Sequence, residues 1–266
     1  MRLHTSPLTT VETATSRRYG TLEQHFALFG GMAFLLTLAL VLPGMAQPAH
    51  YHAFADQRGW GALPHAADVL SNLGFVIAGL AGLVVLWRAD RYRLCATARA
   101  LCALFFAGLL CSGAGSTFYH WAPQDAGLVW DRLGMSVAFA GLLGLAVQTR
   151  IDDISARITT AVVLLAAPIS VWVWSQTSNV LPWVLVQAGG MVIILWLSFV
   201  TPRRHALPVE LGWVIGLYAV AKLLEMSDSD VFEISGHAIS GHSLKHWVAA
   251  AAALPVLRAL QQWRAR

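Results

Sequence analysis

The residues that could carry out chemistry in this chain are a few polar side chains at the ends of long apolar stretches. His242 and His246 open the last stretch, and Ser116 and His120 lie near the end of an earlier one, each pair four residues apart. On a helix this spacing places both side chains on one face, about one turn apart. The two late histidines can therefore present two imidazoles to a single metal ion. Asp131, at the start of a further apolar stretch, adds a carboxylate.

The composition places these groups in a membrane. Of the 266 residues, 57% are hydrophobic and 12% are charged, with a mean hydropathy of +0.59. Soluble domains carry about 25% charged residues, and disordered chains are poor in apolar residues, so both classes are excluded. The net charge is +4. Its basic residues form small groups between apolar stretches, which argues against a nucleic-acid-binding protein.

Eight apolar stretches are long enough to be membrane helices, because a helix needs about 20 apolar residues to cross a bilayer. With short loops between them, they predict an all-α integral membrane protein in one compact bundle. The predicted spans are residues 25–45, 68–87, 97–118, 128–148, 157–175, 181–200, 207–225 and 242–260.

The basic residues test this assignment, since cytoplasmic loops are enriched in Lys and Arg. In the predicted loops and tails, every arginine except Arg58 falls before the first span or after an even-numbered one. Both termini are therefore predicted to be cytoplasmic, and the outer ends of the third, fourth and eighth spans share one side. These arginines are Arg2, Arg17, Arg18, Arg88, Arg91, Arg93, Arg99, Arg150, Arg157, Arg203, Arg204, Arg258, Arg264 and Arg266.

We divide the chain into a cytoplasmic tail (1–24), an extra transmembrane helix (25–46) and a helical core (47–266). The run 26–42 could instead be a signal peptide, cleaved near the small residues at 44–46. Its apolar part and the segment before it are both long for a signal peptide, which favours an uncleaved helix. Cleavage would leave the orientation of the other spans unchanged.

The topology brings His120, His242 and His246 to one level of the bundle, together with Ser116 and Asp131. A single histidine at a helix end is more often a solvated residue. Ionisable groups that gather within a membrane bundle are candidates for function. Three histidines with one open position make a catalytic zinc site, in which the metal lowers the pKa of a bound water to about 7.

These residues resemble a known family. Ser-x-x-x-His at 116–120, Asp131 eleven residues later and His-x-x-x-His at 242–246 are similar to the signature of the alkaline ceramidases. The wider superfamily comprises seven-helix membrane hydrolases and includes adiponectin-receptor-like and GPI-lipid-remodelling proteins. The stretch 67–75 resembles the first core helix of the ceramidases, and 240–246 resembles their bacterial members. The resemblance covers residues 50 to 260.

The resemblance implies a seven-helix hydrolase core, here preceded by the extra helix, and one catalytic zinc ion held by His120, His242 and His246. It implies that Asp131 orients or deprotonates the zinc-bound water and that Ser116 hydrogen-bonds the oxyanion. The substrate would be ceramide or a related N-acyl lipid that comes from the bilayer. The products would be a free fatty acid and an amine.

The sequence departs from the family where eukaryotic alkaline ceramidases carry an acidic calcium site. Asp56, Trp60 and Asp68 are present there, but His65 stands in place of a glutamate, which argues against calcium dependence. At the outer end of the seventh span, Lys222 and Glu225 are expected to form an internal ion pair.

Three other functions remain open from the sequence. The chain could hydrolyse ester-linked or GPI lipids with the same chemistry, or it could be a receptor-like protein with structural zinc. Bis-histidine haem ligation is disfavoured because His242 and His246 share one helix. Short loops and an uncleaved first helix favour a bacterial inner membrane. The sequence leaves the natural lipid and the oligomeric state open.

Overall fold

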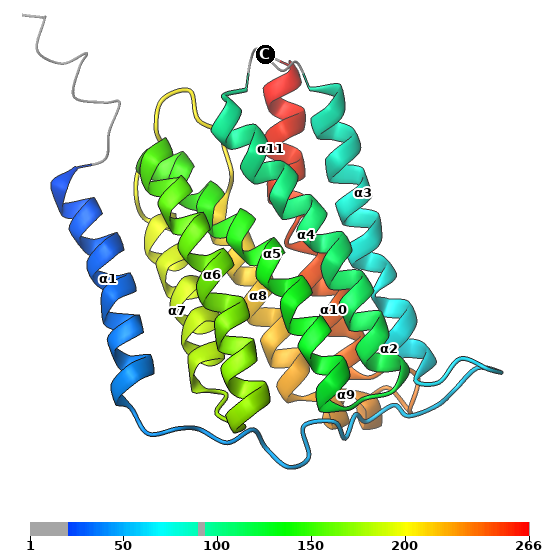
Figure 1. The fold of residues 1–266 in the computed structure, drawn as a ribbon. Helices are drawn as coiled ribbons and strands as arrows, with labels where there is room; N and C mark the ends of the chain where they lie inside the picture. The colour runs from blue at the N-terminus through cyan, green and yellow to red at the C-terminus, as the bar shows by residue number, and fades with distance from the viewer. Residues whose placement is uncertain (1–20, 90–93, 266) are drawn as a thin grey trace, which may run out of the picture.

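The structure, a computed structural model, describes residues 21–89 and 94–265 and is built from helices (Figure 1). The described residues contain two isolated β-bridges and no β-strand. The helices are α1 (Leu22–Val41), α2 (Ala66–Ser71), α3 (Leu73–Arg88), α4 (Ala96–Trp121), α5 (Asp125–Arg150), α6 (Asp153–Thr177), α7 (Leu181–Ser198), α8 (Leu211–Met226), α9 (Asp228–Ile234), α10 (Gly241–Ala251) and α11 (Leu254–Ala265).

Six of the described helices are long and apolar enough to cross a bilayer: α1, the α2–α3 pair, α4, α5, α6 and α7. The prediction of an all-α, multi-pass membrane protein is confirmed at this level. The last two predicted spans correspond to shorter helices that run alongside the others, α8 with 16 residues and α10 and α11 with 11 and 12. The division into a seven-helix core and an extra helix stays a prediction.

The eighth predicted span is interrupted where the sequence suggested one continuous helix. α10 ends at Ala251, and α11 begins at Leu254. Pro255 explains the break, because its ring clashes with the carbonyl group four residues earlier, that of Ala251, and it has no N–H to donate. The second predicted span is similarly divided at Asn72, between α2 and α3.

The first helix is shifted toward the N-terminus relative to the predicted span 25–45. It begins at Leu22, where Thr21 and Gln24 form a capping box, and it ends at Val41, just before Pro43. Nearly all of the predicted tail 1–24 lies outside the described residues, as do Arg91, Arg93 and Arg266.

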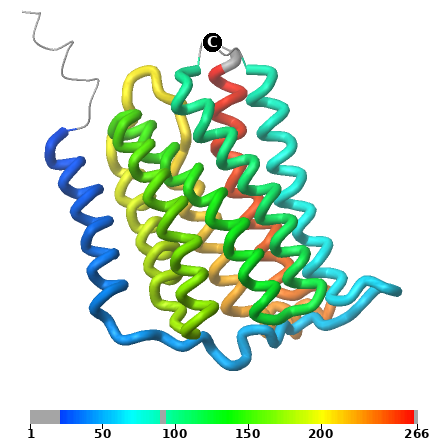
Figure 2. Tube along the Cα trace, viewed as in Figure 1, coloured from blue at the N-terminus to red at the C-terminus, as the bar shows by residue number. Residues whose placement is uncertain are grey.

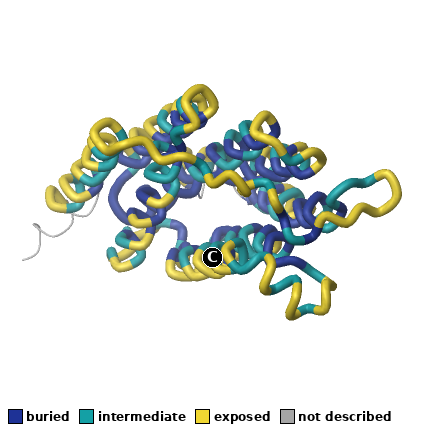
Figure 3. The backbone as a smooth tube through the Cα atoms, turned by 90° about the horizontal axis from the view of Figure 1, so that it is seen from below, coloured by how far each residue is buried: buried dark blue, intermediate teal, exposed yellow. Residues whose placement is uncertain are grey.

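Large apolar side chains on the outside of the bundle fit a lipid environment. Trp87 and Phe199 are more than 80% exposed, and Phe34 and Trp172 are more than 60% exposed. Seen from one end, exposed residues lie on the outward turns of the helices and buried residues face inward (Figure 3). Such extensive apolar exposure would be a liability in water, whereas hydrocarbon solvates it.

Helices α4 and α5 approach each other through glycines. A Cβ atom added at Gly108 or Gly115 of α4 would overlap the backbone of α5, and one at Gly134 or Gly141 of α5 would overlap the backbone of α4. Small residues at a helix interface permit this close contact in lipid. Gly115 lies against the backbone of Trp130 and Asp131, so the pairing sets Ser116 beside the start of α5.

Residues 42–65, which we call the strap, run from α1 to α2 across one end of the bundle (Figures 1 and 2). Hydrogen bonds tie the strap to helices far along the chain. The Met45 N–H donates to Asn179 Oδ1 at 2.9 Å, and the Ala55 N–H donates to Asp228 Oδ2 at 2.9 Å. α4 ends, and α5 and α10 begin, at this strap end of the molecule.

The junctions that carry most of the loop arginines lie at the opposite end. The connections α3–α4, α5–α6 and α7–α8 are on that side, whereas Arg58 belongs to the strap. The charge segregation predicted from the sequence is therefore present among the described residues.

Candidate metal centre

Three histidines from two helices meet at the strap end. His120 lies in the last turn of α4, and His242 and His246 lie in the first turns of α10. The imidazoles are 6% exposed or less, and one nitrogen of each lies within 4.8 Å of the others. The Nε2 atoms of His120 and His242 are 3.2 Å apart. The predicted convergence of these residues is confirmed.

The 3.2 Å separation of His120 Nε2 and His242 Nε2 fits two ligands of one tetrahedral metal ion. Two nitrogens each about 2.0–2.1 Å from zinc are about 3.3 Å apart at the tetrahedral angle. The rings have edge-on arrangements with centroids 4.8 to 5.1 Å apart, so they converge without stacking. Three imidazoles occupy three positions of a tetrahedral ion and leave the fourth open.

The N-terminus of α10 is fixed by local capping and by a distant carboxylate. Ser240 caps the helix by accepting from the Ser243 N–H at 3.0 Å. Asp228 accepts from the His242 N–H at 2.7 Å. A Cβ at Gly241 would overlap the Leu224 carbonyl, so this position requires glycine for close packing on α8.

Ser71 determines how His246 is oriented. The Ser71 hydroxyl donates to the Asp68 carbonyl at 2.8 Å and lies 2.7 Å from His246 Nδ1. Because its only proton is used, the hydroxyl accepts from Nδ1–H, which leaves the lone pair of His246 on Nε2. A second hydrogen bond of this kind orients most metal-binding histidines.

Asp68 extends the same network, and its carboxylate is fully buried. It accepts from the Ser243 hydroxyl at 2.6 Å, whereas its Oδ2 has no hydrogen-bond partner among the described residues. Asp68 and Ser71 belong to the stretch 67–75, whose sequence does not by itself assign either residue to the histidine cluster. Only their position beside α10 reveals this role.

Phe54 of the strap covers the histidines. Its ring centroid lies 4.8 Å from that of His120 and 4.3 Å from that of His242, and the side chain is buried. Nothing in the sequence around Phe54 indicates this contact. An aromatic cover excludes water from one side of the cluster, which strengthens electrostatic interactions inside it.

Ser116 and Asp131 lie together on the α4–α5 interface. The Ser116 hydroxyl is buried and lies next to the Asp131 carboxylate. Ser116 is one helical turn before His120 on the same face of α4. Asp131 is outside the group of atoms that could share one ion.

Asp56, which lies in the region compared above with a calcium site, is paired with an arginine of the same strap. The Asp56 carboxylate is buried and accepts from Arg58 Nε at 2.8 Å and from Arg58 NH2 at 2.7 Å. These hydrogen bonds hold the pKa of Asp56 below its usual value. Trp60 is 62% exposed. A guanidinium already neutralises this carboxylate.

The expected Lys222–Glu225 ion pair is present, and a third residue joins it. Glu225 also accepts from Lys245 Nζ at 2.7 Å. Lys245 precedes His246 on α10, so the pair links α8 to the helix that carries two of the histidines. The contact with Lys245 was not predicted, because Lys245 and Glu225 are 20 residues apart in the sequence.

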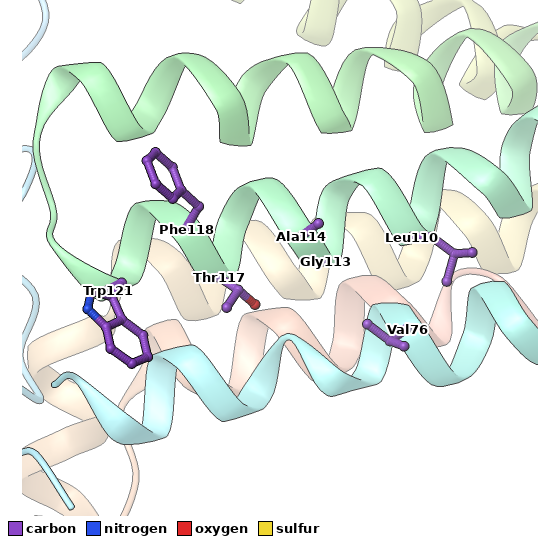
Figure 4. Close-up of a pocket in the computed structure, with 7 residues that line it drawn as sticks. All are labelled: Val76, Leu110, Gly113, Ala114, Thr117, Phe118 and Trp121. Carbon is purple, nitrogen blue, oxygen red and sulfur yellow. The ribbon is translucent and has the colours of Figure 1, made fainter. Parts of the chain in front are cut away.

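An apolar groove of about 550 Å³ lies between α3 and α4 (Figure 4). Thr117 contributes the only side-chain hydroxyl among its lining residues, which are Val76, Leu110, Gly113, Ala114, Thr117, Phe118 and Trp121. Next to Val76, the ring of Phe75 lies 5.9 Å from that of His246. A groove of this composition suits a hydrocarbon chain.

No protein-family model matches the sequence, and no curated protein matches it.

Proposed function

We propose that the protein is a zinc-dependent membrane amidohydrolase that cleaves the N-acyl bond of ceramide or a related N-acyl lipid to a fatty acid and an amine. The observation that carries the proposal is the buried group of three imidazole nitrogens within 4.8 Å of one another, beside the Ser116–Asp131 pair. A bundle with three converging histidines, an adjacent carboxylate and an adjacent hydroxyl suits metal-assisted hydrolysis.

The donor set fits zinc better than calcium or magnesium, which prefer oxygen ligands. His120, His242 and His246 would hold the ion through nitrogen. When bound, zinc supplies Lewis acidity toward the acyl carbonyl and lowers the pKa of a coordinated water to about 7.

The other roles in the reaction would belong to side chains of the protein itself. Asp131, on α5, would orient the attacking water and accept its proton. Ser116 would donate a hydrogen bond to the oxygen on which negative charge develops as the carbonyl is attacked. A positioned donor of this kind contributes about 2.7–4 kcal/mol to the transition state. His246, oriented by Ser71, would keep its Nε2 lone pair directed at the ion.

The site would face the outer side of a bacterial inner membrane, with both termini in the cytoplasm and the seven-helix core preceded by α1. The arginine-rich junctions at the opposite end support this orientation. The lipid would reach the site from the bilayer along the groove between α3 and α4, since Phe75, the neighbour of Val76 in that groove, lies against His246.

Metal analysis tests the site. We expect about one zinc ion per wild-type chain and a large loss in His242→Ala, with His205→Ala as the control, because His205 lies in the α7–α8 connection. Less than about half a zinc per wild-type chain, or no loss in His242→Ala, would contradict the proposal.

Activity assays on detergent-purified protein test the reaction. Ceramide and a phospholipid are supplied side by side, and we expect fatty acid to be released from ceramide. Asp131→Ala and Ser116→Ala should abolish release while zinc stays bound, since neither residue is a ligand. Release from the phospholipid alone would indicate an ester hydrolase. Zinc binding without any release would indicate a structural metal.

A further inference from the structure

A second polar centre lies on the other side of α5, around a buried arginine. Arg132 follows Asp131 in the sequence, but its guanidinium points toward α6 and α7, away from the Ser116 contact on α4. The residue is 1% exposed. By residue volume it is the largest of the fully buried side chains among the described residues.

The guanidinium has few acceptors. NH2 donates to Gln47 Oε1 of the strap at 2.7 Å, whereas Nε and NH1 have no hydrogen-bond partner among the described residues. No carboxylate in the described part of the chain forms an ion pair with it. A buried charge without a hydrogen-bonded counter-ion is costly, so a group that supplies acceptors here would be bound favourably.

Aromatic rings lie close to the guanidinium, whereas two of its nitrogens carry N–H groups without a hydrogen-bond partner among the described residues. The charge lies 4.0 Å from the ring centroid of Trp174, 5.6 Å from that of Tyr51 and 5.8 Å from that of Trp183. These cation–π contacts stabilise the charge without using its N–H groups. The N–H edges of arginine match the oxygens of phosphate and carboxylate groups.

A cavity of about 180 Å³ shares one wall residue, Trp174, with this centre. Trp174, whose ring stacks on Arg132, forms part of its wall, together with Asp125, Ala126, Val129, Ser175 and Ser178. Asp125, Val129 and Arg132 follow one face of α5 at helical spacing. The Asp125 carboxylate is engaged by His52 Nε2 at 3.0 Å and by Gln47 Nε2 at 3.1 Å.

We propose that Arg132 binds a phosphate group, and that the group belongs to a phospholipid headgroup. Arg132 is seven residues after the start of α5, about 10 Å along the helix axis, so it lies in the part of this membrane-spanning helix that is nearer the strap end. The proposal does not depend on zinc or hydrolysis, because the site uses other residues on another side of α5.

Thermal unfolding of the full-length protein in detergent tests the proposal. A short-chain phosphatidylglycerol should raise the melting temperature by about 5 °C at about 100 times its Kd, and a diacylglycerol with the same chains should not. An equal rise with inorganic phosphate would confirm the phosphate site and assign it to the free ion. No rise with either phosphate compound would overturn the proposal.

Two substitutions make the test specific. Gln47→Glu places a carboxylate on the guanidinium, so we expect a folded protein that no longer responds to the phospholipid. Arg132→Gln should also lose the response, whereas Arg157→Gln, which changes an exposed arginine on α6, should keep it. A full response in Gln47→Glu would show that the lipid binds elsewhere and would overturn the assignment to Arg132.

Discussion

Ser71 illustrates how much of the candidate centre depends on single hydrogen bonds. It lies on α2, far from His246 in the sequence, and it fixes which nitrogen of that ring carries the proton. The i, i+4 spacing of His242 and His246 could be recognised from the sequence because it is local. The Ser71 contact and the Phe54 cover could not, because they depend on how α2 and the strap pack against α10.

Replacing Ser71 with alanine removes the acceptor of His246 Nδ1–H. We expect Ser71→Ala to weaken zinc binding about 10- to 100-fold, the usual effect of losing such a partner. Competition with a chelator measures the affinity. Ser198→Ala is the matched control, because that hydroxyl also donates to a helical carbonyl but lies at the end of α7 away from the strap. Equal affinities in the two variants would remove Ser71 from the centre.

The Arg58–Asp56 pair makes the stability of the strap depend on pH. The pKa of Asp56 is lowered in the folded protein, so the pair stabilises the fold above the ordinary pKa of about 4 and loses this effect as the pH falls through the lowered value. We expect Arg58→Gln to lower the melting temperature at pH 6 by a few degrees, and we expect its difference from the wild type to shrink as the pH falls from about 4 to 3.

Arg157→Gln is the control for this measurement, since Arg157 is exposed and donates to a backbone carbonyl. A difference between Arg58→Gln and wild type that stays constant from pH 6 to pH 3 would show that the Asp56 carboxylate is not responsible.

At the scale of helices, the sequence predicted the positions of the elements well and their continuity less well. Apolar length located α4 to α7 within a few residues of the observed bounds. The break between α10 and α11 was missed, because an average over 20 residues conceals a single proline, although Pro255 is visible in the sequence. Glycines on both helices produce the close α4–α5 contact, and which helix they would face depends on how the bundle is assembled.

Adding one methyl group to this interface should separate α4 from α5. In Gly115→Ala the new Cβ meets the Trp130 carbonyl, so we expect a loss of about 1–3 kcal/mol in stability and reduced hydrolysis through displacement of Ser116. Gly216→Ala on α8 is the control, because nothing lies within 4 Å of the added atom. That substitution should stabilise the helix by up to about 1 kcal/mol. The melting temperatures of both variants, compared with that of the wild type, test these two stability predictions.

At the scale of the whole molecule, the two ends of the bundle differ in charge and in chemistry. The strap end carries the histidines, and the opposite end carries most of the arginine-rich junctions. We expect a cysteine at Gly61 to react with a membrane-impermeant maleimide in intact cells and one at His205 to react only after lysis. Cys95, Cys102 and Cys111 are replaced by alanine beforehand. The reverse labelling pattern would invert the proposed orientation.

The strap also constrains the order in which the molecule can be assembled. The residues that hold the strap by hydrogen bonds are synthesised long after the strap itself. Asp125 follows Gln47 by 78 residues, and Asp228 follows Ala55 by 173. At a synthesis rate of about 5–20 residues per second, Asp228 is synthesised roughly 9 to 35 seconds after Ala55. His242 and His246 emerge later still. The contact of Phe54 with His242 can therefore form only after α10 is in place, which makes the cover over the histidines one of the last parts of the fold to be completed.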